Sequence, residues 1–256
     1  MTLDGRRGPD VAGPDVAGPD VARPGGAGPD DSPAWLGSRP VLIFDLGGVV
    51  LDWNPRHLFR KLIPGDEQRE WFLSEVCGPE WNAEMDAGRP FSEAVEELSR
   101  RFPQHREWIS AYHRRWPEML GGPVPGTSEL ITELSEAGRE LYAISNFAAE
   151  MFPVTLQSYP VLRCFRDVVI SSSVGLCKPD RRIFDLALQR FGVAARDCLF
   201  IDDIAANVAG ARAAGIAAVQ FTSAEDLRRL LAAGERPGPG AHQRRLSLPC
   251  PRTLPS

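Results

Sequence analysis

The stretch that decides the fold is Val41-Leu42-Ile43-Phe44-Asp45-Leu46-Gly47-Gly48. Its first four residues form an unbroken apolar run, which is typical of a central parallel strand that is buried on both faces. The two glycines then favour a tight turn. Asp45 therefore stands where a buried strand gives way to a turn, and in open parallel sheets ligands bind just beyond this end of the strands.

The same apolar pattern returns four more times along the chain. Helical patterns separate these runs, at residues 127–137, 179–191 and 205–214. Strands and helices that alternate at this spacing predict an α/β protein with a doubly wound parallel sheet. The further predicted strands are residues 140–145, 167–171, 198–202 and 217–221.

The first strand is followed by a segment that is too long for a simple crossover. Residues 53–122 are rich in helical patterns, and we interpret them as a helical cap over the strand ends. Residues 39–52 and 123–233 are then the two pieces of the core domain.

The two ends of the chain differ in composition from the middle. The pentapeptide Gly-Pro-Asp-Val-Ala begins at Gly8, Gly13 and Gly18, and the C-terminal end is also rich in proline, glycine and arginine. Such segments lack the apolar residues that a packed core requires. The sequence therefore predicts disordered tails at 1–38 and 234–256.

Charge and cysteine usage narrow the classes of partner and compartment. The net charge of −5 argues against nucleic acid as the main partner. No apolar run approaches the roughly 20 residues that a membrane span needs. The five cysteines are odd in number and form no Cys-x-x-Cys pair, which favours reduced thiols in a cytoplasmic protein. Monomer and homodimer both remain open.

Polar side chains follow four of the predicted strands. They are Asp45, Ser145-Asn146, Lys178 after a short loop, and Asp202-Asp203. Because neighbouring strand ends lie about 5 Å apart, we expect these groups to converge. Carboxylates, a hydroxyl and a lysine together suit a phosphoryl group and a hard divalent cation. Mg²⁺ prefers one or two protein carboxylates with phosphate and water oxygens.

Each of these elements also has a simpler interpretation when it is taken alone. Asp45 could bond to backbone amides of its own turn, and Ser145-Asn146 could cap a helix. Lys178 could merely begin a helix, and Asp202-Asp203 could cap the helix at 205. The order of the four elements on successive strands favours a shared site.

The four segments resemble the ordered motifs of haloacid dehalogenase-like hydrolases. The resemblance covers about residues 41–231, and the motifs are close to those of the subgroup that contains sugar-phosphate phosphatases and the N-terminal phosphatase domain of soluble epoxide hydrolase. Asp86-Ala87-Gly88-Arg89-Pro90-Phe91-Ser92 also resembles a cap segment of that subgroup. The resemblance implies a Rossmann-like core with an inserted helical cap. The motifs are Phe44 to Val50, Ser145-Asn146, Lys178-Pro179-Asp180 and Phe200 to Asn207.

The resemblance also implies an activity and roles for individual residues. The expected enzyme is a Mg²⁺-dependent phosphatase that acts on a small phosphorylated metabolite such as a sugar phosphate. Asp45 would attack phosphorus and form an aspartyl-phosphate, and Lys178 would offset the negative charge. Ser145 and the Asn146 backbone would bind phosphate oxygens. The implied metal ligands are Asp45, the Gly47 carbonyl, Asp203, and Asp202 directly or through water.

One departure from the family pattern concerns the proton for the leaving group. Most phosphatases of this superfamily carry a second aspartate where this chain has Gly47, and loss of a general acid typically costs about 100- to 10,000-fold in rate. Either Asp52 or a cap side chain supplies the proton, or the substrate has a good leaving group. Asp52 could equally be a solvated turn residue. The cap candidates for substrate contact are Trp53, His57, Trp81 and Arg89.

Two other functions fit parts of the pattern. A 2-haloacid dehalogenase uses an aspartate nucleophile on the same fold but needs no metal, and it carries a non-acidic segment where this chain has Asp202-Asp203. A phosphate-binding regulatory protein with little turnover is the second alternative, suggested by Gly47 and the long tails.

Overall fold

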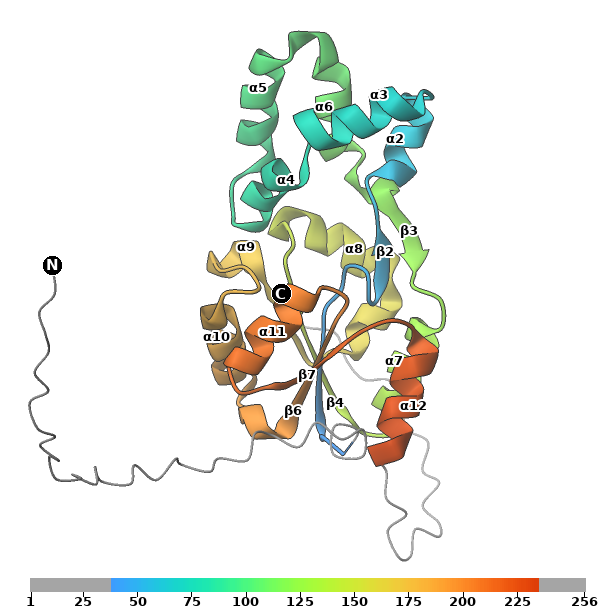
Figure 1. Ribbon diagram of the computed structural model, residues 1–256, viewed down its shortest axis with the longest axis vertical. Coiled ribbons are helices and arrows are strands. Elements are labelled where there is room, and N and C mark those ends of the chain that lie inside the picture. Colours follow the sequence, from blue (N-terminus) through green and yellow to red (C-terminus); the bar gives the residue numbers. More distant parts are fainter. Residues whose placement is uncertain (1–37, 235–256) are drawn as a thin grey trace, which may run out of the picture. The chain divides into compact units, whose positions relative to one another are not determined.

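The computed structural model describes residues 38–234. Apart from Ser38 and Gly234, the predicted tails lie outside the described residues. The described part contains a parallel sheet flanked by helices, together with a helical insertion between β2 and β3 (Figure 1). It contains no helix that is long and apolar enough to cross a membrane.

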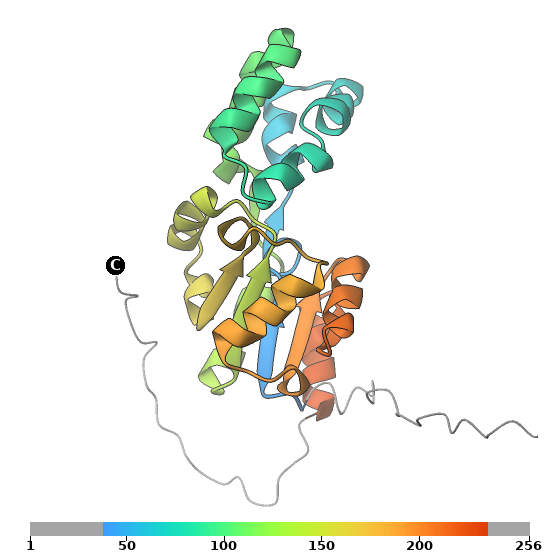
Figure 2. The same cartoon turned by 90° about the vertical axis from the view of Figure 1, so that its left-hand side faces the viewer.

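The sheet has five parallel strands in the order β5-β4-β1-β6-β7. The strands of this order stand side by side in Figure 2, where the blue β1 lies between β4 and β6. The chain runs from β1 to β4 and β5 on one side and then crosses to β6 and β7 on the other side. Because the strand order reverses at β1, the residue that follows it faces the crevice where such sheets bind ligands. The bounds are β1 (Val41–Phe44), β4 (Glu140–Ser145), β5 (Asp167–Ile170), β6 (Cys198–Asp202) and β7 (Ala217–Gln220).

All five predicted strands are thus confirmed, two of them one residue shorter than expected.

The side chains of β1 explain why its apolar run is unbroken. Leu42 and Phe44 pack in a cluster with residues of α7 (Thr127–Glu136) and α12 (Ala224–Gly234). Ile43, on the other face, packs in a separate cluster with α10 (Arg181–Phe191) and α11 (Ala205–Ala213). Each face of the sheet is therefore covered by helices, as Figure 1 shows for these four.

The helices of the core follow the predicted pattern with small shifts. The proline at 179 precedes α10 (Arg181–Phe191) instead of standing in its first turn, because Asp180 is the N-cap and accepts a hydrogen bond from the Arg182 backbone. Between β5 and Lys178 the chain forms one more short helix, so this connection is longer than the sequence suggested. The other core helices are α8 (Phe152–Ser158), α9 (Ser171–Val174) and α11 (Ala205–Ala213).

The insertion begins and ends with a two-stranded antiparallel sheet that the sequence did not predict. β2 (Leu51–Trp53) pairs with β3 (Leu120–Pro123), and Trp53 lies opposite Leu120. This pairing brings the two ends of the insertion together. The helices between them are α2 (Arg56–Leu62), α3 (Asp66–Trp71), which continues as a π-helical turn (Phe72–Val76), α4 (Pro79–Asp86), α5 (Phe91–Arg101) and α6 (Arg106–Arg114).

The helical insertion has an aromatic core of its own. Tyr112 of α6 lies at its centre, with its ring centroid 5.9 Å from that of Phe59 and 5.1 Å from that of Trp81. The same cluster takes in Phe147 and Ala148, which belong to the loop after β4. The insertion therefore packs on the loop that carries the residues of the predicted phosphate site.

Candidate active site

Asp45 lies at the carboxyl end of the central strand. Its backbone N–H donates to the Ile201 carbonyl at 2.8 Å and so continues the pairing of β1 with β6. Its Oδ1 accepts from the Leu46 backbone at 2.6 Å and lies 2.8 Å from Lys178 Nζ. Burial raises the pKa of Asp45 to about 6, against the opposing effect of Lys178. Within the described residues both contacts fall on Oδ1, so Oδ2 is left without a hydrogen-bond partner.

Lys178 is the positive charge between two buried carboxylates. Its Nζ lies 2.8 Å from Asp45 Oδ1 and 2.7 Å from Asp202 Oδ2, and its side chain is 1 % exposed. The Asn146 amide fixes the lysine backbone, since it accepts from the Lys178 N–H at 2.8 Å and donates to the Lys178 carbonyl at 3.0 Å. The loop after β5 is thus tied to the end of β4.

The two adjacent acids, Asp202 and Asp203, have different environments. Asp202 is completely buried, and its oxygens accept from Lys178, from the Ile204 backbone at 2.8 Å and from the Asn207 amide at 3.1 Å. Asp203 Oδ1 is buried with no hydrogen-bond partner among residues 38–234. Burial raises the pKa of Asp203, and the charge of Asp202 adds to this. Asp203 therefore has an oxygen that is free to bind a cation.

The three acids together fit a divalent cation. One ligand oxygen each from Asp45, Asp202 and Asp203 lies within 4.8 Å of the others. One lysine does not balance three carboxylates, and an unpaired buried carboxylate oxygen is costly unless something coordinates it. Carboxylate oxygens are also the ligands that Mg²⁺ prefers. The residues present are therefore suited to this ion.

The two glycines after Asp45 have different surroundings. Gly48 adopts a left-handed backbone with φ of +74°, and any side chain there would collide with the Asp203 carboxylate. Gly47 has no atom within 4 Å of the position that a Cβ would occupy. The close approach of the turn to Asp203 thus requires glycine at 48, whereas position 47 has room for a side chain.

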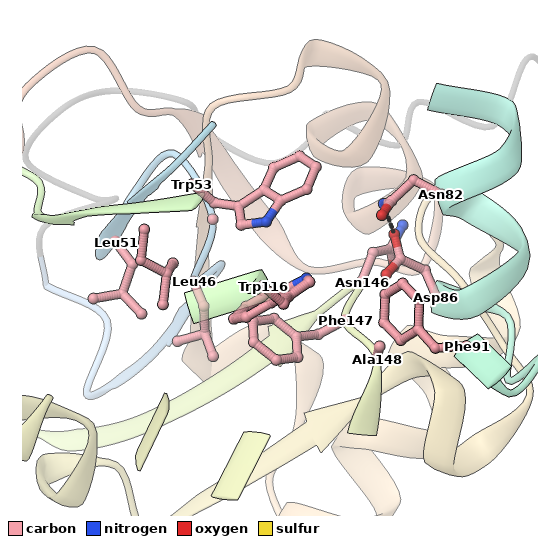
Figure 3. Close-up of a pocket in the computed structure, with 12 residues that line it drawn as sticks. Leu46, Leu51, Trp53, Asn82, Asp86, Phe91, Trp116, Asn146, Phe147 and Ala148 are labelled. Atoms are coloured by element: carbon pink, nitrogen blue, oxygen red, sulfur yellow. Dashed lines mark hydrogen bonds between the residues drawn. The ribbon is translucent and has the colours of Figure 1, made fainter. Parts of the chain in front are cut away.

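A pocket of about 490 Å³, counting the space at its open mouth, adjoins these residues (Figure 3). Gly47 and Asn146 belong to the core side of its lining, and Asn82 and Asp86 come from α4 of the insertion. The rest of the lining is apolar: Leu46, Leu51, Trp53, Phe91, Trp116, Leu120, Phe147 and Ala148.

The predicted site residues meet as expected, with differences in detail. Asp45, Lys178 and Asp202 are in direct contact, and Asp203 lies beside them. Ser145 is buried as the last residue of β4. Asn146 holds the Lys178 backbone through its side chain, a role that the sequence did not indicate.

Among the four cap candidates, Trp53 lines the pocket and the others do not. Trp81 is buried in the aromatic core of the insertion, and Arg89 bridges Glu84 and Glu97. His57 lies 2.8 Å from Asp52, whose side chain is 48 % exposed in β2 and outside the pocket lining.

Several residues of the acid cluster and the pocket were missed from the sequence. Asn207, which holds both oxygens of Asp202, was quoted within a motif but given no role. Asp86 lies in the cap segment that resembles a family motif but was given no role. An acidic residue shortly before Gly88 in that segment was the signal that could have identified it. Nothing in the local pattern distinguishes Asn82, Trp116 and Phe147 from ordinary helix and loop residues.

Comparisons with known proteins agree with this geometry. The model of the haloacid dehalogenase-like hydrolases matches residues 40–215. Phosphatase MT3486 of Mycobacterium tuberculosis (strain CDC 1551 / Oshkosh) is 34% identical over 190 residues, which cover 71% of this chain and 86% of that protein. Sesquiterpene phosphatase astK of Aspergillus oryzae is 25% identical over 181 residues, covering 70% and 88%.

A solved structure gives the same fold. The HAD family enzyme bt-2542 of Bacteroides thetaiotaomicron, in complex with magnesium and inorganic phosphate, matches with a TM-score of 0.57 and 21% identity over 74% of this chain and 97% of that chain. The family model spans more than half of the sequence and includes all the residues of the acid cluster. The chain therefore belongs to the haloacid dehalogenase-like hydrolases.

Proposed function

We propose that this hydrolase is a Mg²⁺-dependent phosphatase that acts on a small phosphorylated molecule through an aspartyl-phosphate on Asp45. The observation that carries the proposal is the buried acid cluster, in which Asp203 has an unpaired oxygen beside Asp45. A pocket lined by residues of the core and of the insertion adjoins this cluster and can take up the rest of the substrate.

The chain's own residues divide the chemistry between them. Asp45 Oδ2 attacks phosphorus, the bond from phosphorus to the leaving oxygen breaks, and water then hydrolyses the acyl phosphate. Lys178 keeps Asp45 oriented through Oδ1 and offsets negative charge near the transferring group. Ser145 and the Asn146 backbone bind phosphate oxygens. Asp45, Asp203 and the Gly47 carbonyl, with Asp202 directly or through water, would hold Mg²⁺, which would supply charge neutralisation for the phosphoryl group.

The acid pair also separates this proposal from its two alternatives. A dehalogenase attacks carbon and has no use for the unpaired oxygen of Asp203, whereas a metal-dependent phosphatase does. A binding protein without turnover would not need a nucleophile whose second oxygen is left free. Chloride release from 2-chloropropionate would support the first alternative, and phosphate binding without hydrolysis the second.

The lining of the pocket favours one class of substrate. Aromatic and aliphatic side chains make up most of it, with two amides and one carboxylate as the polar groups. A sugar phosphate would leave many hydroxyl groups without hydrogen-bond partners in such a pocket, at a cost for each. We therefore propose a phosphate monoester whose alcohol part is apolar.

A substrate panel checks this preference. We expect the kcat/KM for phenyl, benzyl and short prenyl phosphates to exceed that for glucose and fructose phosphates by at least about tenfold, since burial of one apolar side-chain-sized group contributes about 1.5–3 kcal/mol. The measurement is phosphate release at a fixed Mg²⁺ concentration. Trp53→Ala should reduce the preference, with Trp71→Ala, an exposed tryptophan, as its control. Equal or better hydrolysis of sugar phosphates would contradict the proposed class.

Metal binding has a test that does not depend on activity. Mg²⁺ at 100 times its dissociation constant should raise the free energy of unfolding by about 2.7 kcal/mol, because it binds only the folded chain. Asp203→Asn removes the charge of the ligand with the unpaired oxygen and should abolish most of this shift. Thermal unfolding with and without Mg²⁺ measures both. Asp226→Asn, on the exposed start of α12, is the matched control and should keep the full shift. A shift that survives Asp203→Asn would rule out this site.

A further inference from the structure

Asp86 is an acid of the pocket that the proposed mechanism does not use. It is the last residue of α4, and it lines the pocket together with Gly47 and Asn146. Among the described residues that form this lining, it is the one with an ionisable side chain. A carboxyl group therefore stands across the pocket from the position at which the family's general acid is missing.

The helix end that carries Asp86 is fastened to the core. Its backbone carbonyl accepts a hydrogen bond from Ser171 Oγ at 2.6 Å and another from Cys177 Sγ at 3.4 Å. Both donors belong to the segment between β5 and Lys178. The residue is therefore tied to the same loop that carries the lysine of the acid cluster.

The turn after Asp86 approaches the core closely as well. Gly88 has a φ of +108°, and a Cβ there would lie 3.1 Å from the Ser172 carbonyl oxygen. The backbone N–H of Phe91 donates to Glu150 Oε1 at 3.0 Å. These contacts fix where the insertion meets the core beside Asp86.

The side chain of Asp86 is held by its own helix. Asn82 donates to Asp86 Oδ2 at 3.1 Å and accepts from the Tyr112 hydroxyl at 3.0 Å. Figure 3 draws this bond between Asn82 and Asp86, with Phe91 and Asn146 also around the pocket. Oδ1 has no hydrogen bond within residues 38–234, so it is the oxygen that can exchange a proton with a ligand.

The electrostatic surroundings favour the protonated acid near neutral pH. Burial raises the pKa of Asp86 to about 7, with the charge of Asp45 raising it further and Lys178 lowering it. Tyr112 and Cys177 also face this carboxyl, and burial raises the pKa of each above its usual value. Both remain neutral, so they add no charge that would stabilise the ionised carboxylate.

We propose that Asp86 is the general acid and base that replaces the missing aspartate at position 47. In the first step its carboxyl proton moves to the leaving oxygen as the phosphorus–oxygen bond breaks, which releases a neutral alcohol and leaves Asp86 ionised. In the second step Asp86 takes a proton from the water that attacks the aspartyl-phosphate, and inorganic phosphate is released. The inference rests on the proposed phosphatase activity.

Two substrates of similar shape and different leaving group test this role. The benzyl alkoxide is a poor leaving group and needs the proton, whereas the p-nitrophenolate ion leaves without one. Asp86→Asn should lower kcat for benzyl phosphate by about 100- to 10,000-fold, and kcat for p-nitrophenyl phosphate by less than about tenfold. Equal losses on both substrates, or no loss on either, would overturn the proposal.

The pH profile gives a readout that a purely structural role would not move. For benzyl phosphate, kcat/KM of the wild-type protein should fall as pH rises through about 7, because Asp86 loses its proton there. Asp86→Asn should remove this descending limb. Glu80→Gln, which neutralises an exposed acid at the start of the same helix, is the matched control and should keep it. A limb that persists in Asp86→Asn contradicts the assignment.

A rescue experiment uses the space at position 47. Because Gly47 has room for a side chain, Gly47→Asp in the Asp86→Asn background should restore benzyl phosphate hydrolysis by at least about tenfold relative to any change in the p-nitrophenyl phosphate rate. A gain of the same size on both substrates would contradict the proposal. Asp45→Asn distinguishes failure of the phosphatase proposal from failure of the inference about Asp86. If Asp45→Asn retains p-nitrophenyl phosphate hydrolysis, the phosphatase proposal itself fails. If Asp45→Asn is inactive and Asp86→Asn is unaffected, only the inference about Asp86 fails.

Discussion

Replacement of Asp45 by asparagine is expected to lower turnover by at least about 10,000-fold, because loss of a covalent nucleophile typically costs this much or more. The amide has nearly the same shape as the carboxylate, so Leu46 and the surrounding strand need not move. Burial already disfavours the ionised form of Asp45, whose pKa is raised to about 6. Removal of this charge should therefore leave the fold intact.

Phosphate release from p-nitrophenyl phosphate, together with thermal unfolding of the same preparation, measures this effect. Asp52→Asn is the control, because Asp52 is a half-exposed acid outside the pocket and is paired with His57. We expect it to keep the wild-type rate on p-nitrophenyl phosphate, and an unchanged rate on benzyl phosphate, whose leaving group needs a proton, would also exclude Asp52 as the missing general acid. An Asp45→Asn variant that is folded and still active within about tenfold of the wild type would mean that another group attacks the substrate.

Replacement of Lys178 by methionine is expected to affect stability and activity together. Without this ammonium group, Asp45 and Asp202 are left as buried carboxylates with no counter-ion, and the loss of one partner of such a pair typically costs about 3–5 kcal/mol. The pKa of Asp45 should rise further, because the charge of Lys178 lowers it in the wild-type protein. The rate should fall by about 100- to 1,000-fold, as for the loss of one donor that stabilises transition-state charge.

Urea unfolding without Mg²⁺ measures the stability change, and phosphate release with Mg²⁺ measures the rate. The control is Lys61→Met, which removes an exposed lysine paired with Glu118 and should cost at most about 1 kcal/mol. Addition of Mg²⁺ should recover part of the lost stability, since the cation binds the same carboxylates. If Lys178→Met and Lys61→Met have equal effects, Lys178 is not the charge that balances the cluster.

The sheet could be predicted because its local and tertiary requirements agree. The run from Val41 to Phe44 is apolar throughout since both of its faces are covered by helices. β3 could not be predicted in the same way. It contains Gly121, Gly122 and Pro123, which are depleted in strands, and its pairing with β2 depends on a partner nearly 70 residues earlier in the sequence.

The types of residue in the candidate site could be predicted from the sequence, but the role of each residue could not. Parallel topology alone brings Asp45, Ser145 and Asp202 to one edge of the sheet, whereas Lys178 is placed by the connection after β5 and its bonds to Asn146. Which acid keeps an unpaired oxygen depends on Asn207 and the Ile204 backbone, and these contacts follow from the path of one helix. The position of Asp86 depends on how the insertion packs on the core, which no local pattern encodes.

Identification of the residue that carries the phosphoryl group tests the central claim most directly. The protein is mixed with labelled p-nitrophenyl phosphate and Mg²⁺, quenched in acid within one turnover, and digested for mass spectrometry. A phosphoryl group on the peptide that contains Asp45, sensitive to hydroxylamine and missing when Mg²⁺ is removed, is the predicted result. Steady hydrolysis with label on any other residue, or with none on Asp45 at any quench time, would contradict it.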